Sequence, residues 1–248
     1  MNKEFRKSGA HCAPFFHPYP EFNPRNRLIL GLLLTLVVFA VSIILGNVLK
    51  LETNFIPSSF VTHTLMLALS VALILCFKDK VNYRIAFPKF KTVLKPILFG
   101  FLAAFVINIA IGILTVVFTG KTEAHPAVAN ASFLQFLLFD FILASVAEEY
   151  LFRGFLQNYL RPLNTRGFKL FKRRISLPVL ISALAFGFAH LVLIASGVGA
   201  LFLIRMVLFT SAVGLIAGYY QEKYDNHACA ILVHMAGNLM GLISILVR

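Results

Sequence analysis

The sequence predicts an all-α membrane protein, a polytopic bundle of about seven to eight transmembrane helices. Of its 248 residues, 59% are hydrophobic and only 13% are charged, whereas soluble domains have roughly half and about a quarter. The apolar residues form continuous runs of about 20, the length that crosses a hydrocarbon core. Because these runs do not alternate polar and apolar residues, they also exclude a transmembrane β-barrel.

Seven spans are predicted, in chain order at 28–49, 60–77, 93–118, 133–159, 176–195, 199–220 and 228–247. The preceding residues 1–27 are polar and Pro-rich, and we expect them to form a cytoplasmic segment before a transmembrane domain at 28–248. The first apolar run is too long for a signal peptide and lacks a small-residue cleavage site. We therefore expect the first span to be retained.

The orientation follows from the Lys and Arg residues in the connections, because cytoplasmic loops are enriched in them. Five lie in the N-terminal segment, six in 78–95 and seven in 153–174, against one each in 50–59 and 119–132 and none in 196–198. This alternation predicts a cytoplasmic N-terminus and a cytoplasmic 160–175 loop in the cell membrane. Seven spans would place the C-terminus outside the cell. A further re-entrant or split segment would place the C-terminus in the cytoplasm instead.

The net charge of +13 has the same explanation. Its basic residues lie between apolar runs, so they indicate topology and contact with anionic lipid, and no nucleic-acid partner is expected. The three cysteines show no CxxC spacing and predict neither a disulfide framework nor a zinc knuckle. Two glycine pairs favour close helix packing in lipid, Gly214-x3-Gly218 and Gly237-x3-Gly241.

Three acidic residues lie inside or near the fourth run: Asp140, Glu148 and Glu149. A carboxylate at membrane depth costs several kcal/mol unless it is paired, protonated or hydrated, so it marks a candidate functional site. Glu149 and Arg153 are four residues apart and can form an ion pair on one helix face. Glu148 points about 100° away and has no local charge partner. We therefore expect Glu149 to be structural and Glu148, in apolar surroundings, to be a general base.

Further polar residues lie in the later spans. The fifth span contains Phe186-x3-His190, and the seventh contains His234-x3-Asn238 on one helix face. From the helical rise, Glu148 and His190 lie roughly 18 and 21 Å from the cytoplasmic ends of their spans, and His234 roughly 10 Å. The cluster is therefore expected to open towards the cytoplasm.

Together these motifs resemble the CPBP family, also called Abi, of CAAX-processing and bacteriocin-processing intramembrane proteases. Three motifs carry the resemblance, in this order on separate apolar helices: Glu148-Glu149-x3-Arg153, Phe186-x3-His190 and His234-x3-Asn238. The resemblance implies an all-α endopeptidase with its catalytic core at about 133–248, cutting a peptide or protein near the cytoplasmic membrane face.

The resemblance also implies the roles of individual residues. Glu148 and His190 would activate water, His234 and Asn238 would stabilise the oxyanion, and Glu149 and Arg153 would support them. A zinc ion could be held by Glu148, His190 and His234 with an open position for water. The absence of HExxH, and the poor quality of an amide such as Asn238 as a zinc ligand, favour a mechanism without metal.

Two other functions fit parts of the pattern. A non-catalytic scaffold or bacteriocin-immunity protein would bind a peptide in the same cavity. A proton-coupled transporter would use Asp140, Arg205 and the site residues as a relay, but the internal repeat expected of such transporters is not found. The short length and sparse loops are typical of a bacterial protein, which favours peptide processing over CAAX removal.

Overall fold

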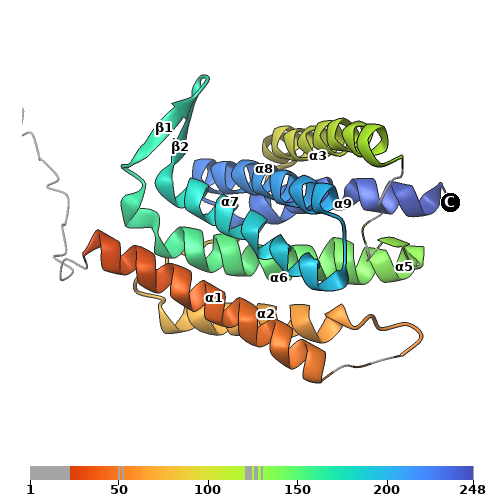
Figure 1. The fold of residues 1–248 in the computed structure, drawn as a ribbon. Coiled ribbons are helices and arrows are strands. Elements are labelled where there is room, and N and C mark those ends of the chain that lie inside the picture. The colour runs from red at the N-terminus through yellow and green to blue at the C-terminus, as the bar shows by residue number, and fades with distance from the viewer. Residues whose placement is uncertain are drawn as a thin grey trace, which may run out of the picture.

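The computed structural model describes residues 23–49, 51, 53–120, 125, 128–129 and 131–247. The predictions for residues 1–22, Lys50 and Lys121 concern residues outside this set. The described chain forms one helical bundle, with a single β-hairpin projecting from one end (Figure 1). The all-α prediction is confirmed.

Among the described residues, six helices are long and apolar enough to cross a membrane: α1 (Pro24–Val48), α2 (Ser59–Cys76), α3 (Phe90–Thr119), α7 (Leu177–Ala189) with its 3-10 continuation η4 (His190–Ser196), α8 (Ala200–Tyr224) and α9 (His227–Leu246). Their bounds lie within a few residues of the predicted spans. The two largest shifts are at α1, which begins at Pro24 instead of residue 28, and at α8, which ends at Tyr224 instead of residue 220. Asn23 caps this helix by accepting from the Arg25 amide, and proline suits the first helical position.

The predicted fourth span is helical throughout 133–159, but its hydrogen bonding changes along its length. It consists of α5 (Phe133–Gln135), the π-helix η1 (Phe136–Ala144), α6 (Ser145–Glu149) and the π-helix η2 (Tyr150–Gln157). This segment packs against α2, α7 and α9 through the middle of the bundle (Figure 1). Short π segments inside helices occur frequently at functional sites. Here they flank the single α-helical turn that carries both glutamates.

The predicted 160–175 loop contains regular structure that the sequence reading missed. A 3-10 turn, η3 (Arg161–Leu163), is followed by the antiparallel strands β1 (Gly167–Leu170) and β2 (Arg173–Ser176). Gly167 starts the hairpin with φ of 155°, and a Cβ atom there would collide with the Ile175 carbonyl. Only glycine fits this close approach between the strands.

Both glycine pairs lie where helices approach closely, as predicted. Gly214 faces the Arg153 guanidinium and Gly218 faces the Gln157 amide, so α8 leaves room for two polar side chains of the fourth segment. On α9, Gly237 packs on Val213. The small residues therefore admit buried polar groups as well as neighbouring helices.

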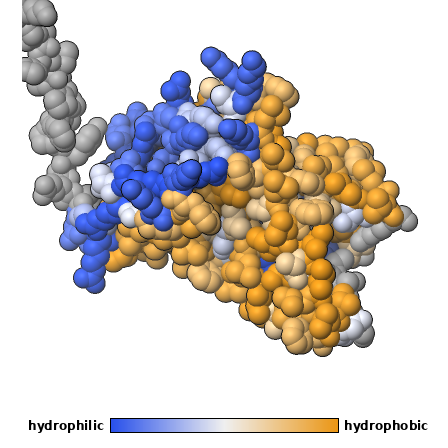
Figure 2. Space-filling view, turned by 90° about the horizontal axis from the view of Figure 1, so that it is seen from above, coloured by the Kyte–Doolittle hydropathy of each residue, from blue (hydrophilic) through white to orange (hydrophobic). Residues whose placement is uncertain are grey.

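The surface of the bundle is divided by polarity. Hydrophilic residues gather at the end that carries the hairpin, and apolar residues cover most of the remaining face (Figure 2). Large apolar side chains are exposed along the outer helices, including Leu36 on α1 and Val117 on α3. With six apolar spans, this surface is that of a multi-pass protein embedded in a membrane.

Candidate active site

A cavity of about 930 Å³ lies inside the bundle. All four predicted catalytic residues line it: Glu148, His190, His234 and Asn238. They come from α6, the start of η4 and α9, which are far apart in the sequence. The two predicted supporting residues, Glu149 and Arg153, are fully buried. The fold therefore brings the whole predicted set to one place.

The predicted ion pair between Glu149 and Arg153 is confirmed. The Arg153 Nη1 atom lies 2.8 Å from Glu149 Oε1, and neither side chain is exposed. The guanidinium also lies over the Phe186 ring, with its Cζ atom 4.4 Å from the ring centroid, a favourable cation–π arrangement. Arg153 is thus held by a carboxylate on its own helix and an aromatic ring on α7.

Glu149 has a second partner that the helix pattern did not reveal. Its Oε1 atom accepts a hydrogen bond from His234 Nδ1 at 3.0 Å. A carboxylate on one ring nitrogen sets the orientation of the imidazole and directs the other nitrogen elsewhere. Here His234 Nε2 lies 3.7 Å from Glu148 Oε2. His234 therefore bridges the two adjacent glutamates.

Glu148 has no ion-pair partner on its own helix, but the expectation that it lies in apolar surroundings is wrong. Besides His234 on one carboxylate oxygen, His63 Nε2 lies 3.6 Å from the other, Oε1. Sequence reasoning missed His63 because it comes from the first turns of α2, and a lone histidine at a span end carries no motif. Both distances are just beyond direct hydrogen-bond range. The carboxylate therefore lies between two imidazoles in a polar part of the cavity, not in apolar surroundings.

His190 directly follows the last residue of α7. Its Nδ1 atom lies 3.0 Å from the Phe186 carbonyl oxygen, which only an N–H can contact favourably. The neutral ring therefore carries its proton on Nδ1 and keeps an acceptor lone pair on Nε2. The Phe186 ring also packs edge-on against both His190 and His234, with centroids 5.0 and 5.2 Å away. Phe186 thus orients both histidines.

Asn238 lies one helical turn after His234. Its Nδ2 atom donates to Ser145 Oγ at 3.1 Å, and Ser145 is fully buried on the α6 turn. This hydrogen bond fixes the amide plane at the edge of the cavity. Ser145 is a second site residue that sequence reasoning missed. The sequence did offer one signal for Ser145, because a residue three positions before Glu148 lies on the same helix face as Glu148.

A catalytic zinc needs three converging protein ligands. Within the residues described, no group of three or more His, Cys, Asp or Glu side chains is arranged to hold a metal ion. His63 and His234 approach different oxygens of Glu148. Glu148, His190 and His234 remain the residues that would hold a zinc ion.

The cavity reaches the end of the bundle opposite the hairpin. Its lining includes residues from two connections at that end, among them Thr53, Ile56 and His125, and also Ser196, the last residue of η4. The cavity thus lies in the half of the bundle away from the 160–175 loop, and the expectation that the cluster opens towards the cytoplasm stays a prediction. Counting residues along a helix gives the depth of a residue in the membrane. It does not show which half of the bundle is filled by side chains, and here that is the half next to the hairpin.

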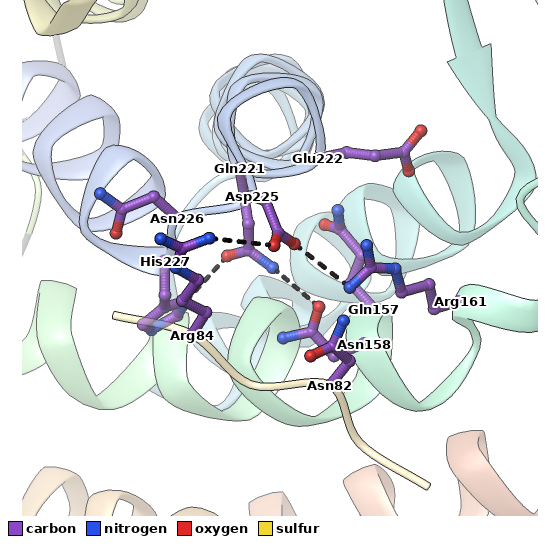
Figure 3. Close-up of a pocket in the computed structure, with 10 residues that line it drawn as sticks. All are labelled: Asn82, Arg84, Gln157, Asn158, Arg161, Gln221, Glu222, Asp225, Asn226 and His227. Atoms are coloured by element: carbon purple, nitrogen blue, oxygen red, sulfur yellow. Dashed lines mark hydrogen bonds and ion pairs between the residues drawn. The ribbon is translucent and has the colours of Figure 1, made fainter. Parts of the chain in front are cut away.

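A second, much smaller pocket of about 20 Å³ lies at that hairpin end (Figure 3). Asp225 lies between two arginines there, 3.8 Å from Arg84 and 3.2 Å from Arg161. Below it, His227 Nδ1 contacts Gln221 Oε1 at 2.8 Å. No predicted site residue lines this pocket. These side chains fill the pocket by pairing with one another. Their contacts connect the α2–α3 connection to the α8–α9 turn.

The comparisons with known proteins agree with this arrangement. The family model described as type II CAAX prenyl endopeptidase Rce1-like matches residues 130–240. Over this region the chain is similar to that family. The Rce1-like region contains all three motifs, so the resemblance to CAAX-processing proteases is confirmed. At the family level the activity is that of an intramembrane endopeptidase acting on a peptide or protein. No curated protein and no solved structure matches the chain.

Proposed function

We propose that the protein hydrolyses a peptide bond with water activated by Glu148 and His190, and that His234 and Asn238 stabilise the oxyanion. The observation that carries the proposal is the shared cavity, in which these four residues meet. Each imidazole and the amide is already oriented by a neighbour. Such preorganisation is what electrostatic catalysis requires.

The proton transfers follow from the positions of these groups. Glu148 accepts a proton from the water held near His190 Nε2, and the water oxygen attacks the peptide carbonyl carbon. Negative charge develops on the carbonyl oxygen, and Asn238 and His234 supply N–H donors for it. When the C–N bond breaks, Glu148 returns its proton to the leaving amine. No step uses a metal ion.

The direct test replaces the proposed base. Glu148→Gln keeps the shape of the side chain but cannot accept the proton from water. We expect cleavage to fall by about 10²–10⁴-fold, the usual contribution of general acid–base catalysis, with unchanged yield and melting temperature in detergent. The assay is cleavage of labelled membrane peptides by purified protein, read by mass spectrometry.

Asp140→Asn is the matched control, because Asp140 is a second carboxylate lining the same cavity outside the proposed set. Full activity of Glu148→Gln would end the assignment of the base. A peptide that binds parent and Glu148→Gln protein equally, and that neither cleaves, would instead support a peptide-binding scaffold or immunity protein. The cavity favours that alternative as well, since apolar side chains such as Phe136, Phe209 and Met240 also line it.

A further inference from the structure

The β-hairpin has two different faces. In an antiparallel pair, residues directly opposite each other share a face, and successive residues alternate between the faces. Beyond the pair at its base, three cross-strand pairs form the hairpin: Phe168–Ile175, Lys169–Arg174 and Leu170–Arg173. The first and third pairs therefore lie on one face, which is mainly apolar, and the second pair lies on the other face, which is basic. The hairpin is amphipathic.

The apolar face is turned towards the transmembrane spans. Ile175 is buried on this face. Arg173, next to the turn, places its guanidinium over the Phe99 ring of α3, with the Cζ atom 4.6 Å from the ring centroid. The same atom lies 5.5 Å from the ring centroid of Tyr219 on α8. Since the two faces point in opposite directions, the basic face points away from these spans.

Tyrosines mark the level of the hairpin along the spans. The last turns of α8 contain Tyr219, Tyr220 and Tyr224, and tyrosine is enriched where spans meet the membrane surface. The hairpin extends sideways from this end of the bundle, across the direction of the helices (Figure 1). An element that leaves the spans in this direction and at this level runs along the membrane surface.

Part of the apolar face has no cover within the described part of the chain. Phe168 and Leu170 are 42% and 40% exposed, and Phe171 at the turn is 94% exposed. Apolar side chains of an amphipathic element at the membrane surface enter the boundary between lipid headgroups and acyl chains. The bilayer around the spans is therefore the nearest apolar environment that can cover these three side chains.

Charge complementarity indicates which lipid this surface fits. Residues 161–176 include six Lys and Arg and no Asp or Glu. Arg161 is paired with Asp225, whereas Lys169 and Lys172 are exposed near the turn and form no ion pair with another described residue. A lysine close to an anionic membrane surface is attracted to it, and its apolar stem packs on lipid while the ammonium reaches a phosphate. Acidic phospholipid supplies both the apolar boundary and the negative charge.

We propose that the hairpin lies on the membrane surface and binds acidic phospholipid. Phe168, Leu170 and Phe171 enter the boundary between headgroups and acyl chains, and Lys169 and Lys172 contact lipid phosphates. The inference concerns a surface outside the cavity, so it stands or falls independently of the proposed hydrolysis.

The chain contains no tryptophan, so a single introduced tryptophan reports its own surroundings. Phe168→Trp places this reporter on the apolar face, and Lys169→Trp, at the adjacent residue, places it on the basic face as the matched control. Each full-length variant is reconstituted into vesicles whose lipids carry bromine on the acyl chains close to the headgroups. We expect bromolipid to quench Phe168→Trp at least about twice as strongly as Lys169→Trp, because adjacent strand residues point to opposite faces. Iodide in the aqueous phase should quench the two reporters in the reverse order.

The role of charge is tested in the Phe168→Trp chain, by comparing quenching by brominated phosphatidylglycerol and brominated phosphatidylcholine. We expect Lys169→Gln together with Lys172→Gln to lower the preference for the acidic lipid by about fivefold or more, since each Lys near an anionic surface contributes about that factor. Arg25→Gln together with Lys78→Gln is the control. It removes two exposed positive charges from α1 and the α2–α3 connection, and it should leave the preference unchanged.

Equal quenching of the two reporters by bromolipid would overturn the inference. Quenching of Phe168→Trp by iodide alone would also overturn it, and would indicate an apolar face in water that a protein partner covers. Equal loss of the lipid preference in both pairs of charge variants would show that the hairpin is not the binding surface. If Phe168→Trp does not fold, Leu170→Trp on the same face takes its place, and the same outcomes count for and against the inference.

Discussion

At the scale of residues, His234 connects most of the site. One ring nitrogen contacts Glu149, the other faces Glu148, and the ring packs on Phe186. Glu149 in turn shares its Oε1 atom between His234 and Arg153. The second glutamate of the motif therefore positions the His234 imidazole as well as pairing with the arginine.

Arg153→Ala is expected to lower both folded yield and activity. Removing one partner of a buried ion pair leaves an uncompensated charge and typically costs about 3–5 kcal/mol. Thermal unfolding in detergent measures the stability, and Arg153→Lys tests whether charge alone suffices. If Arg153→Ala is as thermostable as the parent but inactive, then Arg153 contacts the substrate instead.

His63→Gln tests the residue that the motifs did not include. His63 flanks the Glu148 carboxylate from α2, so we expect it to position the base without contacting the reacting atoms. Loss of such a supporting group typically costs about 10–100-fold in activity. We expect the loss in kcat, with KM little changed, and an altered pH profile of kcat/KM. A parental pH profile and kcat would exclude this role, and His125→Gln serves as a second cavity histidine for comparison.

Chelation tests the proposal that no metal takes part. We expect a strong chelator to leave the cleavage rate of purified protein unchanged, because the donors around Glu148 do not converge as zinc ligands do. Elemental analysis of the same preparation should find no stoichiometric zinc. The proposal would be overturned by about one zinc ion per chain that chelation removes together with the activity, if adding zinc back restores the activity.

At the scale of elements, the α8 glycines make the buried polar layer possible. A Cβ atom at Gly214 would overlap the Arg153 guanidinium. We expect Gly214→Ala to destabilise the protein by about 1–3 kcal/mol, as overpacking does, and to reduce activity by displacing Arg153. Gly112→Ala is the control, because a Cβ atom at Gly112 on α3 meets nothing within 4 Å. Equal melting temperatures for the two variants would show that α8 has room to shift.

The elements also show what local pattern can predict. Every apolar run became a helix, because a run of that length satisfies its backbone in lipid only by intrahelical hydrogen bonds. The change to π-helical bonding on either side of Ser145–Glu149 was not predictable. This change in hydrogen bonding depends on how the fourth segment packs against its neighbouring helices. The sequence of the segment contains no local signal for that packing.

At the scale of the whole molecule, charge and volume are distributed in opposite directions. Hydrophilic residues gather at the hairpin end (Figure 2), where the fourth segment is tightly packed, and the cavity lies in the other half. The two ends of the described bundle therefore differ in both polarity and packing.

The sequence by itself determined the spans, the alternation of basic connections, the Glu149–Arg153 pair and the motifs that carry the family resemblance. These depend on composition or on residues within one helical turn, so they can be read locally. Only the tertiary structure decided that His63 flanks Glu148, that Ser145 holds Asn238 and that the cavity lies in the half of the bundle away from the hairpin. Each of these depends on which helices lie side by side and which half of the bundle their side chains fill. No local spacing in the sequence encodes such contacts.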